Sequence, residues 1–101
     1  MELRHLRYFV AVAETGIFSG AAAHLRITQP ALWRQVHDLE GELGVRLFER
    51  SGRRVRVTSA GEDLLLRCRD LLGDFQQLTE YAQAMRSAER GRLACFGRPT
   101  W

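Results

Sequence analysis

The chain has 101 residues, which is enough for one small domain with a single modest core and too few for two such domains. Hydrophobic residues make up 46% of the chain, and this share excludes a disordered polypeptide. The net charge is +3, and all of this excess lies in residues 1–58, which hold nine arginines against six acidic residues. All fifteen basic residues are arginine, whose planar guanidinium suits two-point contacts to phosphate and guanine.

The apolar stretches and the cysteines indicate the compartment. The longest purely apolar stretch near the N-terminus covers only residues 8–13, which is too short for a signal peptide or a membrane span. Cys68 and Cys95 lack the spacing of a zinc site, so both are expected to be reduced thiols. We therefore expect a cytoplasmic protein without a membrane partner.

Three helices are predicted in the first half of the chain. The first covers residues 3–15, where apolar side chains recur at helical spacing, and Gly16 ends it. The second covers residues 20–25 with Ser19 as its N-cap. The third covers residues 29–43, with Thr28 as its N-cap and a proline in its first turn. The stripe predicted for the first helix consists of Leu3, Leu6, Phe9, Val10 and Ala13.

The second and third helices form a helix-turn-helix over about residues 18–37, joined by a turn at residues 26–28. The buried stripe of the third helix consists of Leu32, Val36, Leu39 and Leu43. Its other side is left facing outward, and this side carries Gln29, Pro30, Trp33, Arg34 and His37. In such a unit the second helix enters the major groove of DNA, where side chains can discriminate bases.

A basic β-hairpin, or wing, is predicted after the third helix. Its strands cover residues 46–50 and 53–57, and a turn at Ser51 and Gly52 joins them. Five arginines lie between positions 46 and 56 against a single acidic residue, Glu49. A basic wing tip suits the narrow, electronegative minor groove of A·T-rich DNA.

A long fourth helix is predicted over residues 59–89, with Thr58 or Ser59 as its cap. Its apolar residues alternate between spacings of four and three, which is the pattern of a coiled-coil seam that packs against a partner helix. The alternative is that this helix folds back on its own domain. Residues 90–101 show no periodicity and form an unassigned tail. The dimerisation seam consists of Leu64, Cys68, Leu71, Phe75, Leu78, Ala82 and Met85, widened by Leu65 and Leu72.

Several segments together resemble the N-terminal domain of LysR-type transcriptional regulators. They are residues 1–9, 28–32, 34–36, 39–40, 42–50 and 58–62, within a resemblance that spans about residues 1–90. The resemblance implies a mainly α fold, with a winged helix-turn-helix of three helices and a hairpin on residues 1–58. It also implies a linker helix over residues 59–89 that pairs antiparallel with a second subunit, and commonly a tetramer on two DNA sites.

The resemblance also implies roles for individual side chains. Gln29, Pro30 and Arg34 would read or line the major groove, and Arg53 would reach the minor groove. From the residues alone, Arg34 suits guanine and Gln29 suits adenine. The full set of expected DNA-binding residues is Thr28, Gln29, Pro30, Trp33, Arg34, His37, Arg50, Arg53 and Arg54.

Two features depart from the family pattern. Trp33 replaces the usual serine of the recognition helix, and we expect its indole to hold the helix out of the groove, so that Trp33→Ser increases affinity. The other outcome is that the indole packs on a thymine methyl group or a sugar. The chain also stops where the effector-binding domain of the family should begin. We therefore expect no small-molecule effector and a dimer rather than a tetramer.

The residues predict no catalytic, metal or cofactor site. His5, His24 and His37 lie on separate helices without metal-ligand spacing, and the chain has no nucleophile elbow, no phosphate-cradling loop and no lysine. We expect no enzyme. The expected partners are double-stranded DNA and a second copy of the chain, with RNA polymerase and full-length relatives as further candidates.

Two alternative functions stay open. One is a truncated partner that dimerises with full-length relatives through residues 61–85 without productive DNA binding. The other is the DNA-binding domain of a molybdate-responsive regulator, which shares the winged-helix start.

Overall fold

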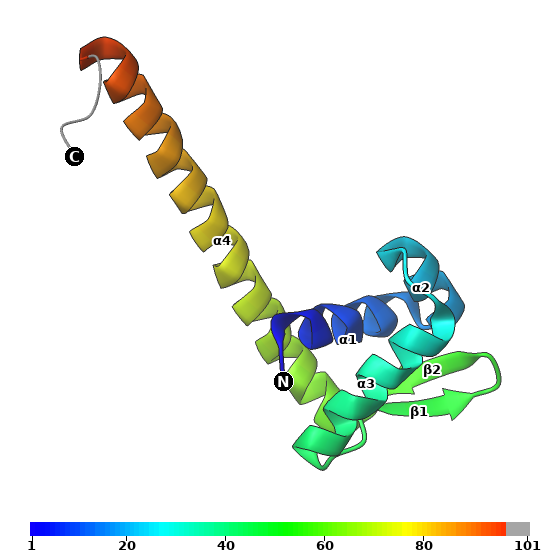
Figure 1. Cartoon of the computed structure of the whole chain (residues 1–101). Coiled ribbons are helices and arrows are strands. Elements are labelled where there is room, and N and C mark those ends of the chain that lie inside the picture. Colours follow the sequence, from blue (N-terminus) through cyan, green and yellow to red (C-terminus); the bar gives the residue numbers. More distant parts are fainter. Residues whose placement is uncertain (97–101) are drawn as a thin grey trace.

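The computed structural model describes the backbone of residues 1–96 and the side chains of residues 1–90. Three short helices and a hairpin form a head, residues 1–58, from which a long helix projects (Figure 1). The described elements are α1 (Leu3–Thr15), α2 (Phe18–Leu25), α3 (Gln29–Leu43), β1 (Phe48–Ser51), β2 (Arg54–Val57) and α4 (Ser59–Phe96). The molecule measures 62 × 25 × 20 Å. The predicted mainly α architecture with a two-stranded wing is confirmed.

The core of the head lies where α1, α2 and α3 meet the hairpin. The Phe48 ring of β1 packs against Phe9 of α1 at 5.3 Å and against Phe18 of α2 at 6.1 Å between ring centroids. These contacts fasten the hairpin to the helices. Within α1 the buried residues are Leu6, Phe9 and Val12, so the predicted stripe is corrected by the addition of Val12. Its other members are only partly buried, namely Leu3, Val10 and Ala13.

Helix α2 begins two residues earlier than the sequence predicts. Its N-cap position is Ile17, whose carbonyl accepts the Ala21 N–H at 3.1 Å, so Ser19 lies inside the first turn and is not the cap. The early start places Phe18 in the core beside Phe48. At the other end, Arg26 adopts a left-handed conformation with φ 60° and terminates the helix. Tertiary packing of one aromatic ring has therefore overridden the local capping preference.

Helix α3 begins as predicted. The Thr28 hydroxyl accepts the Ala31 N–H at 3.2 Å, and Pro30 stands in the first turn, where its missing N–H leaves no hydrogen bond unmade. Gly44, with φ 70°, ends the helix in the left-handed conformation that favours glycine.

The hairpin loop lies one residue later than predicted. Ser51 pairs with Arg54, so the loop consists of Gly52 and Arg53, and Gly52 takes a φ of 64°. A glycine with positive φ at the first loop position matches the twist of the two strands. The strand also starts later, at Phe48, because the preceding backbone is held elsewhere: the N–H of Leu47 donates to Glu40 Oε2 at 2.7 Å.

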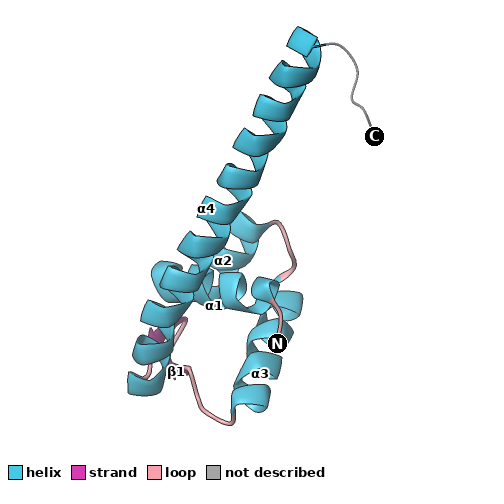
Figure 2. Ribbon diagram, turned by 90° about the vertical axis from the view of Figure 1, so that its left-hand side faces the viewer, coloured by secondary structure: helices cyan, strands magenta, loops and turns pink. Residues whose placement is uncertain are grey.

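Helix α4 is capped by Thr58, whose hydroxyl accepts the Gly61 N–H at 3.0 Å. Its first turns pack on the head beside α1, and the rest leaves the head as a single helix (Figure 2). The helix reaches Phe96, so the predicted end at residue 89 is wrong and the first part of the predicted tail is helical. Residues 97–101 of that tail, and the side chain of Cys95, lie outside the described residues.

A candidate nucleic-acid interface

The N-terminal half of α3 presents a row of exposed side chains beside the hairpin. Gln29, Pro30, Trp33 and Arg34 line a hollow of about 410 Å³, and Arg50 of β1 completes its wall. The structure therefore brings a wing residue together with four of the residues predicted to read DNA. The sequence assigned Arg50 to the wing, but its position beside Trp33 arises only from the fold.

The arginines of the hairpin divide between its two faces. Arg50 stands opposite Val55 on the face that packs toward α3, while Arg54 stands opposite Ser51 on the other face. Arg53 lies in the loop. A second hollow, of about 510 Å³, lies between the hairpin and the helix-turn-helix, and its lining includes Ser19, Gln29, Arg50 and Arg53.

The basic side chains of this surface are available to a ligand. Arg34, Arg50, Arg53 and Arg54 are exposed, and within the part of the chain that the structure describes none of them forms an ion pair. Their positive charge is therefore not neutralised from inside the molecule. Exposed arginines concentrated on one surface attract polyanions and favour bidentate contacts to phosphate.

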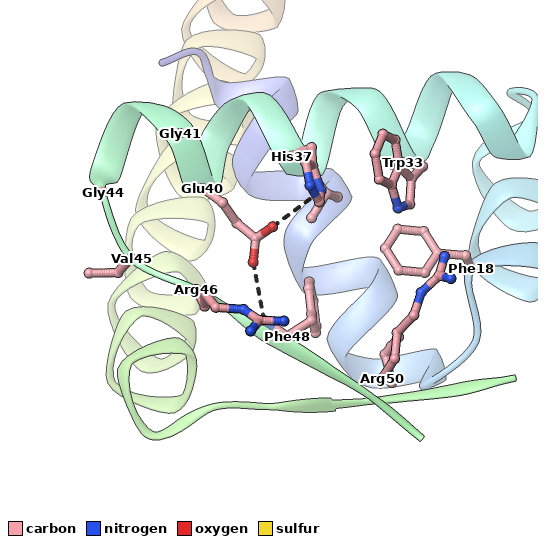
Figure 3. A pocket seen from close by; sticks show the side chains of 12 residues that line it. Phe18, Trp33, His37, Glu40, Gly41, Gly44, Val45, Arg46, Phe48 and Arg50 are labelled. Carbon is pink, nitrogen blue, oxygen red and sulfur yellow. Dashed lines mark hydrogen bonds and ion pairs between the residues drawn. The ribbon is translucent and has the colours of Figure 1, made fainter. Parts of the chain in front are cut away.

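Trp33 and His37 form a stacked pair on the side of α3 that faces the wing. Their ring centroids lie 4.0 Å apart with an interplanar angle of 20°. His37 Nδ1 lies 3.4 Å from Glu40 Oε1, and the other oxygen of Glu40 accepts the Leu47 N–H. Figure 3 shows the indole extending from α3 toward Phe18 and the end of the Arg50 side chain. A groove of about 630 Å³ lies between α3 and β1, and its lining includes Phe18, Trp33, His37, Glu40 and Arg50.

Two hydroxyl groups, those of Thr28 and Ser19, lie at the starts of the two helices of the helix-turn-helix. The Thr28 oxygen accepts the hydrogen bond that caps α3, so the O–H donor and the second lone pair of this oxygen are what Thr28 can offer to DNA. Ser19 is exposed in the first turn of α2 and lines the hollow that Gln29 and Arg53 share. It is a candidate contact that the sequence analysis missed, because a serine before a short helix reads first as an N-cap.

The seam of α4 divides into a buried and an exposed part. Cys68 is only 3% exposed and belongs to the core of its own head, so its prediction as a dimerisation residue is wrong. Leu64 and Leu65 are partly buried against the same core. Burial also raises the pKa of the Cys68 thiol, which makes it a poor nucleophile.

Beyond Cys68 the seam is exposed except at Leu72, which is half-buried beside α1 and α2. Leu71, Phe75, Leu78 and Met85 all present apolar surface to solvent, and Tyr81, which the sequence analysis did not include, extends the same patch. The Arg7 guanidinium of α1 lies 5.5 Å from the centroid of the Phe75 ring. This contact and the exposed pairing of Arg69 with Glu14 at 3.5 Å also connect α4 to α1. The patch formed by Leu71, Phe75, Leu78, Tyr81, Ala82 and Met85 is called the α4 seam below.

His5 has a structural role at the start of α1. His5 Nδ1 accepts the Glu2 N–H at 2.9 Å and so closes the capping box of α1. Over the described residues, no three histidine, cysteine or acidic side chains come together in a way that could hold a metal ion. Each helix of the described residues is either too short or too polar to span a membrane.

Comparison with known proteins gives curated relatives along most of the chain. The HTH-type transcriptional regulator TfdT of Cupriavidus pinatubonensis is 45% identical over 100% of this chain and 45% of its own length. The HTH-type transcriptional regulator AlsR of Bacillus subtilis is 48% identical over 92% of this chain and 31% of its own length. The chain thus spans less than half the length of these relatives.

The chain is also similar to a solved structure of a DNA-binding domain and matches one family model. The BenM_DBD/catB site 1 DNA complex superposes with a TM-score of 0.83 and 44% identity over 88% of this chain and 96% of that chain. BenM is an HTH-type transcriptional regulator of Acinetobacter baylyi. The family model described as "Bacterial regulatory helix-turn-helix protein, lysR family" matches residues 3–62. The chain therefore belongs to the LysR family of bacterial regulatory helix-turn-helix proteins.

Proposed function

We propose that this chain is the DNA-binding part of a transcriptional regulator and that it binds double-stranded operator DNA as a dimer. The observation that carries the proposal is the joint surface of α3 and the hairpin, where Arg34 and Arg50, both exposed and without an ion pair among the described residues, line the hollow beside Trp33. A similar chain, BenM_DBD, has been solved with DNA. Helix α3 would enter the major groove and the hairpin the minor groove.

The proposed contacts divide by type. Arg34 and Gln29 would meet base edges, as a guanidinium suits guanine and a carboxamide suits adenine. Arg50, Arg53 and Arg54 would contact the backbone or the minor groove, where a positive charge gains most. Thr28 would donate to a phosphate at the start of α3, and Pro30 and His37 would line the major groove.

The same proposal divides the chain into a DNA-binding head, residues 1–58, and a linker helix that starts at residue 59. The α4 seam would pack antiparallel on a second copy, because exposed apolar side chains at heptad spacing gain free energy when a partner helix covers them. We assign no catalytic activity to the chain. The proposed compartment is the cytoplasm, which holds the DNA of a bacterium.

The first prediction tests the wing. The double variant Arg53→Ala with Arg54→Ala is expected to weaken binding to every DNA sequence, because it removes two charges from the hairpin without altering α3. The slope of log K against log salt should flatten by about one for each phosphate that is no longer neutralised. Gel-shift titrations of the whole chain at several salt concentrations measure both quantities.

A matched control removes charge elsewhere. Arg4 is exposed in the first turn of α1, and the N-terminal end of α1 lies away from the hairpin (Figure 1), so Arg4→Ala should leave the slope unchanged. An unchanged slope in the double variant would remove the wing from the interface. A chain that dimerises but shows no salt-dependent DNA binding would support the alternative function, a partner that pairs with full-length relatives.

The second prediction tests base reading. Arg34→Ala is expected to cost about 1 to 3 kcal/mol on the preferred sequence and to relax the preference at one base pair of each half-site, because the variant cannot form a bidentate pair of hydrogen bonds to guanine. The variant Arg34→Lys keeps the charge without the planar fork, so it should lose the preference while retaining more affinity. Binding-site selection on the three proteins gives the comparison. An equal decrease in affinity on all sequences would make Arg34 a phosphate-binding residue instead.

A further inference from the structure

The indole of Trp33 is an apolar surface within a set of polar and cationic groups. The residue is 40% exposed, and the hollow that it lines is otherwise formed by Gln29, Pro30 and two arginines, Arg34 and Arg50. Pro30 and Trp33 thus give this hollow two apolar walls. Exposed apolar rings at a polar binding surface point to an apolar group in the ligand.

The indole is braced in its position. It stacks on His37, whose ring is near Glu40, and Glu40 is in turn anchored by the Leu47 N–H. This series of contacts joins α3 to the start of β1, so the ring meets a ligand in a position already set before binding. A braced ring loses little side-chain entropy when a ligand covers it.

The direction of the ring decides between the two roles that the sequence left open. An indole that stood straight out from α3 would hold the helix away from DNA, and its removal would increase affinity. In the structure the ring instead lies along His37 and extends toward Phe18 and Arg50 (Figure 3). A ring in this position adds less width to the outer side of α3 than an upright ring would, and it is open to a ligand over 40% of its surface, which favours a contact role over a spacer role.

The major groove of DNA offers one apolar group for such a hollow. Guanine, adenine and cytosine present hydrogen-bonding groups there, and thymine adds its C5 methyl group. A phosphate oxygen forms no favourable contact with the face of an indole. Arg34 and Arg50, which line the same hollow, are the groups that would bind a phosphate.

Resting on the proposed DNA binding, we propose that Trp33, together with Pro30, forms a pocket for the C5 methyl group of one thymine in each half-site. Trp33 is then a specificity residue that recognises thymine by its shape, while Gln29 and Arg34 contact the hydrogen-bonding edges of neighbouring bases. Discrimination of thymine at this position depends on the methyl group and not on its O4 acceptor.

The test replaces thymine by deoxyuridine, one position at a time, in the DNA sequence selected by the unmutated chain. This change removes the methyl group and keeps the hydrogen-bonding edge. One position in each half-site should weaken binding by about fourfold, the effect of taking one methyl group out of an apolar contact. In Trp33→Ser the same replacement should change the affinity by less than about 1.5-fold, since one of the two apolar walls of the pocket is absent.

Two control variants keep the test decisive. Trp33→Phe retains a flat apolar ring and should keep part of the deoxyuridine effect, even if Trp33→Ser were to misfold. Arg53 does not line the hollow beside Trp33. Arg53→Ala should therefore lower the affinity for the thymine and the deoxyuridine DNA equally and leave the ratio of the two affinities near fourfold.

The outcomes separate the two proposals. If the unmutated chain binds the selected DNA but tolerates deoxyuridine at every thymine, methyl recognition is overturned and DNA binding stands. If Trp33→Ser and Trp33→Phe both keep the full effect, another residue recognises the methyl group and the role of Trp33 is overturned. If the chain binds no DNA sequence, the proposed function itself fails.

Discussion

The variant Leu71→Asp is expected to convert the proposed dimer into a monomer. Leu71 lies in the α4 seam between the head and Phe75, and it is 47% exposed in the single chain. In a dimer each protomer would place a carboxylate in an apolar interface without a partner. An uncompensated charge in such a position costs several kcal/mol, and a symmetric interface contains it twice. Sedimentation at several protein concentrations measures the change.

Leu66 provides the matched control for this experiment. It lies on the same helix, is 63% exposed, and does not belong to the α4 seam. Leu66→Asp introduces the same charge and should leave the dimer intact. A monomeric unmutated chain at micromolar concentration, or a dimer that survives Leu71→Asp, would show that the seam is not the dimer interface.

The largest effect on stability is expected at Gly61, in the first turns of α4. A Cβ atom at this position would lie 2.5 Å from the carbonyl oxygen of Leu47 and 2.5 Å from Val57 Cγ1. The Leu47 carbonyl is held in place because it accepts the Thr58 N–H at 2.9 Å. Gly61→Ala should therefore force α4 away from the hairpin and cost about 1 to 3 kcal/mol in the free energy of unfolding.

Thermal unfolding followed by circular dichroism measures this cost, at one protein concentration because dimerisation makes the midpoint concentration-dependent. A destabilisation of this size lowers the midpoint by roughly 4 to 8 °C for each kcal/mol in a domain of this length. Gly73→Ala is the control, since nothing lies within 4 Å of its Cβ position on the same helix. That variant should gain about 0.5 to 1 kcal/mol. Equal midpoints for the two variants would contradict the crowding at Gly61.

Gly61 and Leu71 lie ten residues apart on α4, and their substitutions should act independently. Gly61 sets how the helix leaves the head, whereas Leu71 contributes only to the surface that a partner would cover. Gly61→Ala is therefore expected to lower stability without changing which residues form the seam. Analysis of both variants by sedimentation and by thermal unfolding separates a folding defect from an assembly defect.

The sequence by itself determined the features that depend on neighbouring residues. The bounds of α1 and α3, the Thr28 cap and the left-handed Gly44 follow from helical periodicity and capping preferences within a few positions. The second strand of the wing follows from the alternation of valine and arginine over residues 54–57. These patterns were readable because each depends on hydrogen bonds or side chains that lie close together along the chain.

Only the tertiary structure decided which of these features share a surface. Helix α2 begins at Phe18 because the Phe18 ring packs against Phe48 in the core. Cys68 is not part of the exposed seam because the head covers it. Arg50 lies beside Trp33 because the hairpin folds back on α3, although the two residues belong to different elements. Contacts between distant residues depend on how whole elements pack, and no periodicity within one element records that packing.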